Sequence, residues 1–276
     1  MRKKDIENLI MDMKEEKITI EEVMTVKNGV ECRAFRIDRA DDPVSPIVYY
    51  SENETVGEIA DRIRNIARAE YPDLAPGRLT DKGYVLSHTH IGLQKESEEE
   101  GFLKRSYLNV EVFLQVDLDL DDEIASAKVT PEMAHCLGLS EDDLWNAAIR
   151  NDRDLYSVHS MSELLGLPEG IGADMFVVTS SRRFNGAAAL YFPEVFRDFC
   201  IGRGEDVCYI LPSSTEEVIV LPASSVEDVP DIRCLAELVQ QVNDEQVDPL
   251  IQLEPAVYEY AVSTNEIEVA ATLQMR

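Results

Sequence analysis

Short runs of β-branched, aromatic and aliphatic residues, separated by turn-forming residues, recur along the chain and predict a protein rich in β-strands. The most strongly patterned stretch is 174–222, where such runs occupy 175–179, 207–211 and 218–221. Alanines and spaced apolar residues between the first two runs predict a helix that Asn185 caps with its side chain and that closely spaced glycines end. The short gap between the last two runs predicts an antiparallel hairpin, because a parallel pair needs a longer crossover.

The N-terminal part mixes helical and strand patterns. Apolar residues at helical spacing predict a helix over 6–13. Asn28 and Gly29 predict the two-residue turn of a β-hairpin, since both positions tolerate a positive φ. Thr55 is placed to cap a second amphipathic helix. The same patterning predicts two further strands, over 83–93 and 107–118.

An acidic stretch over 117–128 is the predicted boundary between two domains. Beyond it, Thr130 and Ser140 are each placed to cap a helix, and three acids that complement the helix dipole follow Ser140. Further helices are predicted at 160–165 and 235–242, and a hairpin at 257–273. The predicted fold class is α+β, with two halves that each pack a mainly antiparallel sheet against helices. The N-terminal domain covers 1–122 and the C-terminal domain, centred on 174–222, covers 123–276.

The charge balance limits the classes of partner. The chain has 54 Asp and Glu against 26 Lys and Arg, a net charge of −28, and no lysine follows Lys128. Such a charge repels phosphate backbones and anionic lipid, which argues against direct nucleic-acid binding and membrane attachment. A basic protein partner fits the charge, and so does an excess of carboxylates that only keeps the protein soluble. The oligomeric state leaves no signal in the sequence.

The five cysteines are scattered and include no CxxC pair, which favours reduced thiols in the core of a cytoplasmic protein. The N-terminal residues lack the uninterrupted apolar run of a signal peptide, and no run is long enough to span a bilayer. We therefore expect a cytoplasmic protein that is neither secreted nor inserted into a membrane.

Several stretches are similar to a family without an assigned function. They are VKNGVECRAFRID and SPIVYY near the N-terminus, GLSEDDLWNAAIRN in the middle, and MFVVTS, NGAAALYFPEVF, YILPSSTEEVIVLP, LVQQVN and VYEYAV towards the end. Through them the chain resembles, over most of its length, the bacterial domain of unknown function numbered 5688, found mainly in Firmicutes. The resemblance implies a bacterial cytosolic protein and no particular reaction.

The first candidate site is an anion pocket. Arg182 and Arg183 precede Asn185 and Gly186, at the predicted start of a helix, where free backbone amides point outwards. Two guanidinium groups beside such amides are suited to bind an anion. The chain has neither a GxGxxG nor a Walker sequence, so a solvated loop explains the same residues.

The second candidate site is a metal site at His88 and His90. Residues two apart on a strand share one face, so a strand over 83–93 would place both imidazoles side by side. A recognisable third ligand is missing nearby, and polar residues that alternate outward on a strand explain the pair equally well. We expect no cofactor.

Three functional hypotheses follow. The favoured one is a non-enzymatic acidic protein that acts on another macromolecule through its surface, since the sequence contains no coherent catalytic constellation. The second is a nucleic-acid mimic whose carboxylates inhibit a DNA-binding or defence enzyme. The third is an enzyme that uses the anion pocket near Arg182 and Asn185 or a metal at His88 and His90.

Overall fold

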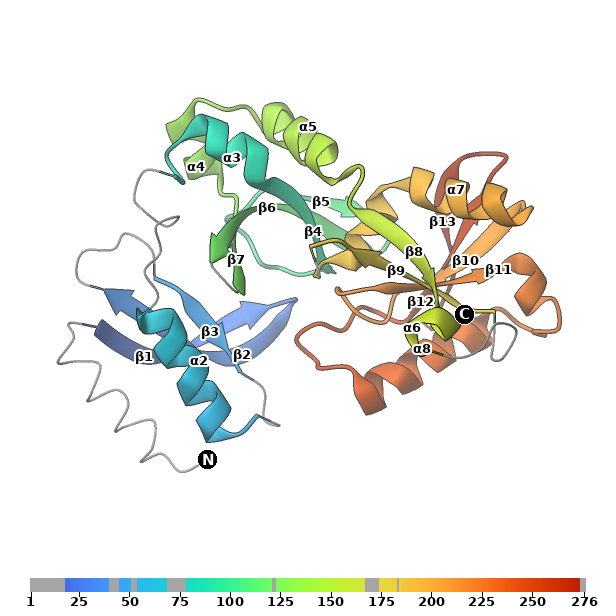
Figure 1. Cartoon of the computed structure of the whole chain (residues 1–276), viewed down its shortest axis with the longest axis horizontal. Helices are drawn as coiled ribbons and strands as arrows, with labels where there is room; N and C mark the ends of the chain where they lie inside the picture. Colours follow the sequence, from blue (N-terminus) through green and yellow to red (C-terminus); the bar gives the residue numbers. More distant parts are fainter. Residues whose placement is uncertain are drawn as a thin grey trace.

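The structure is a computed structural model that describes residues 18–39, 45–50, 54–68, 78–120, 123–166, 174–182 and 184–273. Three mainly antiparallel sheets carry helices on their faces, which confirms the α+β class (Figure 1). The sequence predicted two such sheets, and the chain forms three because the strands of the N-terminal half divide between two of them.

The first sheet is a three-stranded meander with one helix packed on it. It contains β1 (Ile18–Lys27), β2 (Val30–Arg39), β3 (Ile47–Tyr49) and α2 (Val56–Arg68). Asn28 and Gly29 have φ angles of 52° and 72°, so the predicted hairpin turn is confirmed. Thr55 accepts a hydrogen bond from the Glu58 amide at 3.3 Å and thereby caps α2 as predicted. The helix predicted over 6–13 lies outside the described residues.

The second sheet has the order β4-β6-β5, with β7 pairing β6, and three helices lie along it (Figure 1). Its elements are α3 (Lys82–His88), β4 (Thr89–Lys95), β5 (Lys104–Tyr107), β6 (Val110–Leu120), β7 (Glu123–Lys128), α4 (Pro131–Leu137) and α5 (Glu141–Asp152). The strand predicted over 83–93 is wrong in its first half. Asp81 accepts a hydrogen bond from the Tyr84 amide and caps helix α3 there.

The third sheet has six antiparallel strands in the order β13-β12-β10-β11-β9-β8. The strands are β8 (Tyr156–Ser160), β9 (Phe176–Ser180), β10 (Val207–Leu211), β11 (Val218–Pro222), β12 (Ala256–Ala261) and β13 (Glu266–Thr272). The helical elements are α6 (Met161–Leu164), η1 (Gly186–Tyr191), α7 (Pro193–Arg203), η2 (Ala223–Val226) and α8 (Arg233–Gln246). Both predicted hairpins, β10–β11 and β12–β13, are confirmed.

Helices α7 and α8 cover opposite faces of this sheet (Figure 1). Successive residues of a strand point to opposite faces of the sheet. Ile210 and Val220 pack in the cluster that contains Phe196 of α7, whereas Leu211 and Leu221 pack in the cluster that contains residues of α8. Each face therefore has its own apolar layer, and the two helices hold the sheet between them.

The predicted domain boundary after residue 122 falls between β6 and β7, which pair with each other. The largest cluster of buried side chains extends from Val85 to Ile267 and so includes residues from both sides of it. The turn residue Asn28 also reaches the C-terminal part, since its Nδ2 donates to the Gln252 carbonyl at 2.6 Å. The division at residue 122 stays a prediction.

All five cysteines are free, but only Cys200 and Cys208 are buried, so the expectation of core thiols holds for these two. Cys136 and Cys234 are exposed and Cys32 is partly exposed. Within the described residues, no helix has the length and apolar character needed to cross a bilayer.

Candidate functional site

Arg182 lies in a buried ionic cluster with His90, Asp117 and Asp152. Its guanidinium contacts the Asp117 carboxylate directly and lies 3.9 Å from Asp152 Oδ1. Nδ1 of His90 lies 2.5 Å from Asp152 Oδ1, and its Nε2 lies 3.9 Å from Asp117 Oδ2. The four side chains are between 0% and 13% exposed. The cluster therefore places two carboxylates beside one guanidinium and one imidazole.

Four elements bring these side chains together. His90 comes from β4, Asp117 from β6, Asp152 from the last turn of α5, and Arg182 from the loop after β9. The Ile91 amide donates to Asp152 Oδ2 at 2.7 Å, so Asp152 fixes the end of α5 on β4 through both carboxylate oxygens. The cluster thus connects the second sheet to the third.

Burial dominates the electrostatics of the cluster. It raises the pKa of Asp117, although the positive charges of Arg182 and His90 oppose the rise. Burial, followed by the nearby Asp152 carboxylate, raises the pKa of Tyr156 well above its usual value. The Nε atom of Arg182 is buried without a hydrogen-bond partner among the described residues. The charged groups of the cluster find their hydrogen-bond and ionic partners mainly in one another. Such an arrangement is typical of a network that stabilises the fold.

The residues of the predicted anion pocket do not form one open group of donors. Asn185 has a φ of 54° and makes no side-chain capping bond, so its predicted capping role is wrong. The Gly186 amide donates to the Glu216 carbonyl at 2.9 Å, and the Ala187 amide donates to the Thr215 carbonyl at 3.2 Å. A short 3₁₀ turn, η1, precedes α7, which ends at Gly204 as predicted.

The two arginines of the predicted anion pocket do not provide a free pair of cationic groups among the described residues. Arg183 lies outside the described residues. Arg182 directs its guanidinium to Asp117, so an anion would have to compete with this carboxylate. Anion binding at this corner therefore stays a prediction.

His88 and His90 do not share a strand face, which corrects the geometry assumed for a metal site. His88 is the last residue of α3 and stacks on Tyr84 with ring centroids 3.9 Å apart. His90 is on β4 and faces the ionic cluster. The described residues contain no group of three or more His, Cys, Asp or Glu side chains placed to hold a metal ion.

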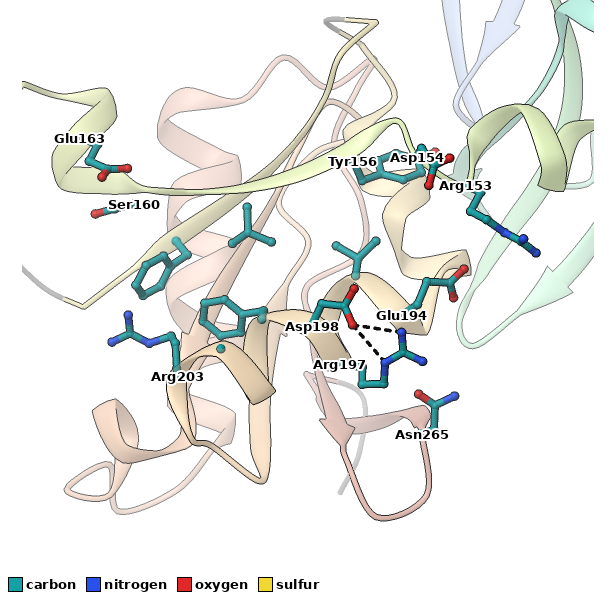
Figure 2. Close-up of a pocket in the computed structure, with 15 residues that line it drawn as sticks. Arg153, Asp154, Tyr156, Ser160, Glu163, Glu194, Arg197, Asp198, Arg203 and Asn265 are labelled. Carbon is teal, nitrogen blue, oxygen red and sulfur yellow. Dashed lines mark hydrogen bonds and ion pairs between the residues drawn. The ribbon is translucent and has the colours of Figure 1, made fainter.

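A groove of about 1070 Å³ lies between β8 and α7 (Figure 2). Its apolar lining consists of Tyr156 and Val158 on β8, Phe176 on β9, and Val195 and Phe199 on α7. The two apolar residues on β8 are two positions apart and therefore share one face of the strand. The two on α7 are four positions apart and therefore share one face of the helix. The groove therefore has an apolar floor built from two regular elements.

Charged side chains surround this floor. Arg197 bonds to Asp198 at 3.0 Å and Arg203 bonds to Asp174 at 2.6 Å. Within the described parts of the chain, no ion pair is found for the acids Asp154, Glu163 and Glu194, nor for Arg153. Figure 2 shows Glu163 at one end of the groove and Asp154 at the other. The uncompensated charge around the groove is therefore negative.

The sequence pattern did not reveal this groove, because strand β8 was missed. The signal is weak: in YSVHS only Tyr156 and Val158 are strand-favouring residues, and they alternate with polar ones. The five-residue run follows helix α5 closely. Period-two alternation over 156–160 is the feature that would have indicated a strand.

The chain was compared with protein families, curated proteins and solved structures. A family model described as a family of unknown function, DUF5688, matches residues 3–262. Neither the curated proteins nor the solved structures contain a match to the chain.

Proposed function

Since the chain belongs to the DUF5688 family, whose function is unknown, its role must be argued from its own residues, and we propose that it is a binding protein for a basic protein partner. The observation that carries this proposal is the excess of acids, 54 against 26 basic residues. Such a field attracts cationic partners and repels nucleic acids and anionic membranes.

The distribution of the charges supports a localised role. Asp154, Glu163 and Glu194 surround a groove with an apolar floor, and no ion pair among the described residues neutralises them. Scattered carboxylates kept for solubility need no such floor beside them. An apolar floor contributes affinity for a partner, and unpaired charges around it select a partner of opposite charge.

The ionic cluster does not support an enzymatic role as well as the groove supports binding. His90, Asp152 and Arg182 are buried and point at one another. A catalytic acid or base has to reach a substrate, either directly or through one water molecule. The five free cysteines support the cytoplasm as the setting, because oxidising compartments favour disulfides.

Binding of three labelled probes, followed by fluorescence anisotropy, tests the proposal. The probes are a disordered Lys/Arg-rich peptide, an acidic peptide of equal length, and duplex DNA. We expect saturable binding of the basic peptide alone at about 150 mM salt, weakening as salt is raised. Absence of that binding, or equal binding of the DNA, would contradict the proposal.

A further inference from the structure

Strand β8 forms an open edge of the six-stranded sheet. Its inner side pairs with β9 in antiparallel register, and within the described residues no strand pairs with its outer side. At one end of β8 the Ser181 amide donates to the Leu155 carbonyl at 2.9 Å. At the other end the Met161 amide donates to the Met175 carbonyl at 2.9 Å. The odd-numbered residues of this strand are therefore the ones whose backbone bonds to β9.

The even-numbered residues point their backbone groups the other way. In an antiparallel ladder, successive residues alternate between bonding to one neighbour and to the other. The N–H and C=O groups of Tyr156 and Val158 are therefore directed to the open edge. The side chains of the same two residues lie in the floor of the groove below α7. The groove and the unpaired backbone edge are thus parts of one surface.

A strand added at this edge would meet three complementary features. Its backbone would bond to Tyr156 and Val158, and alternate side chains would turn towards Val195 on α7. Cationic side chains would find Asp154 and Glu163 near the two ends of β8 and Glu194 on α7. An acidic or folded ligand gains little from these features, since it lacks either the charge or the exposed backbone.

We infer that the groove beside β8 binds an extended, basic peptide segment of a partner protein, which joins the sheet as a seventh strand. Strand addition of this kind obtains affinity from main-chain hydrogen bonds and specificity from alternate side chains. The inference rests on the proposed function, because it names the site and the conformation at which the basic partner binds. The length of β8, five residues, sets the length of the paired segment.

The test uses the protein and three capped probe peptides of about eight residues, in which lysine and valine alternate; the parent probe is unmodified. One probe carries N-methyl groups on every second residue along the edge that would face β8. Methylation removes the backbone donors of that edge and leaves the charge unchanged. A third probe with the methyl groups on the opposite edge controls for the effect of methylation on peptide conformation.

The inference predicts that methylation on the pairing edge weakens binding about tenfold, as expected for the loss of one or two hydrogen bonds, while the opposite-edge probe binds like the parent. Amide exchange measured by NMR should slow at Tyr156 and Val158 on addition of the parent probe. Ser157 and His159, already bonded to β9, should change little.

Two results would overturn strand addition and leave the proposed function standing. One is equal binding of all three probes, and the other is binding without protection of Tyr156 and Val158. If no cationic probe binds at all, the proposed function fails as well. If sedimentation shows a dimer in which these two amides are protected before any peptide is added, the edge belongs to a second copy of the chain and the inference is wrong.

Discussion

The Nδ1 atom of His90 lies 2.5 Å from Oδ1 of Asp152, a carboxylate that is completely buried. The second oxygen of Asp152 accepts the Ile91 amide at 2.7 Å. Asp152 thus holds a side chain and a backbone group of β4 at the end of helix α5.

Asp152→Ala should lower the free energy of unfolding by about 3 kcal/mol, because it leaves the His90 imidazole and the Ile91 amide buried without their hydrogen-bond partner. Urea unfolding followed by circular dichroism measures the change. The control is Asp228→Ala, since Asp228 is exposed. A loss as small as that of the control would show that Asp152 does not connect α5 to β4.

Gly186→Ala should destabilise the fold by about 2 kcal/mol, a typical cost of overpacking. A Cβ at this position would overlap the backbone carbonyl of Glu216, which also accepts the Gly186 amide. Backbone on both sides leaves little room for relaxation. The control, Gly202→Ala, adds the same methyl group where no atom lies within 4 Å. Equal thermal midpoints for the two variants would contradict the close approach.

Asn28→Gly should cost about 1–2 kcal/mol through lost hydrogen bonds, because glycine keeps the positive φ of the turn. The Asn28 side chain donates to the Gln252 carbonyl at 2.6 Å and accepts from the Lys95 amide at 2.8 Å. Gly29→Ala, which strains the turn but keeps both bonds, is the comparison. Hydrogen exchange of the Lys95 amide should quicken only in Asn28→Gly, and unchanged exchange there would argue against the contact.

Glu111 should make stability depend on acid pH. Burial raises the pKa of Glu111, but hydrogen bonds from Lys104 at 2.7 Å and Gln94 at 2.9 Å outweigh it and hold the pKa below its usual value. A lowered folded-state pKa stabilises the protein above the unfolded pKa of about 4.3, and this contribution is lost as the pH falls through the folded-state value.

The thermal midpoints of the native protein and Glu111→Gln, measured from neutral to acid pH, test this. The variant should be less stable at neutral pH, and the difference should shrink as the pH falls below about 4.3. Other titrating groups cancel in the difference. A gap that stays constant over the whole range would show that the ionised form of Glu111 contributes nothing.

Local signals in the sequence predicted the elements that depend on local chemistry. Asn28 and Gly29 predicted a turn, Ser140 predicted a helix start and Gly204 predicted the end of α7. The structure has all three, and Ser140 forms a capping box with Asp143. Residues 83–88 were misassigned because Tyr84 and Val85 favour strands, whereas the Asp81 cap and packing made a helix. Tertiary contacts overrode the intrinsic preference there.

The candidate sites depend on contacts between distant residues, and so the sequence revealed them poorly. His90 and Asp152 are 62 positions apart, and Asp117 and Arg182 are 65 apart. The sequence indicated Arg182 as a candidate anion ligand, but its contact with Asp117 follows only from the position of the loop after β9 beside β6. The groove required β8, whose five residues carry a weak strand signal.

The most direct test of the proposed binding site compares the probe affinity of two variants, one that loses three negative charges around the groove and one that loses three elsewhere. The groove variant combines Asp154→Asn, Glu163→Gln and Glu194→Gln. The control combines Glu237→Gln, Asp244→Asn and Glu245→Gln, three exposed residues of α8. Both variants have the same net charge. We predict that affinity for the lysine–valine probe at about 150 mM salt falls about tenfold in the groove variant and stays near the native value in the control. Equal affinities for the two variants would show that the groove is not where the basic partner binds.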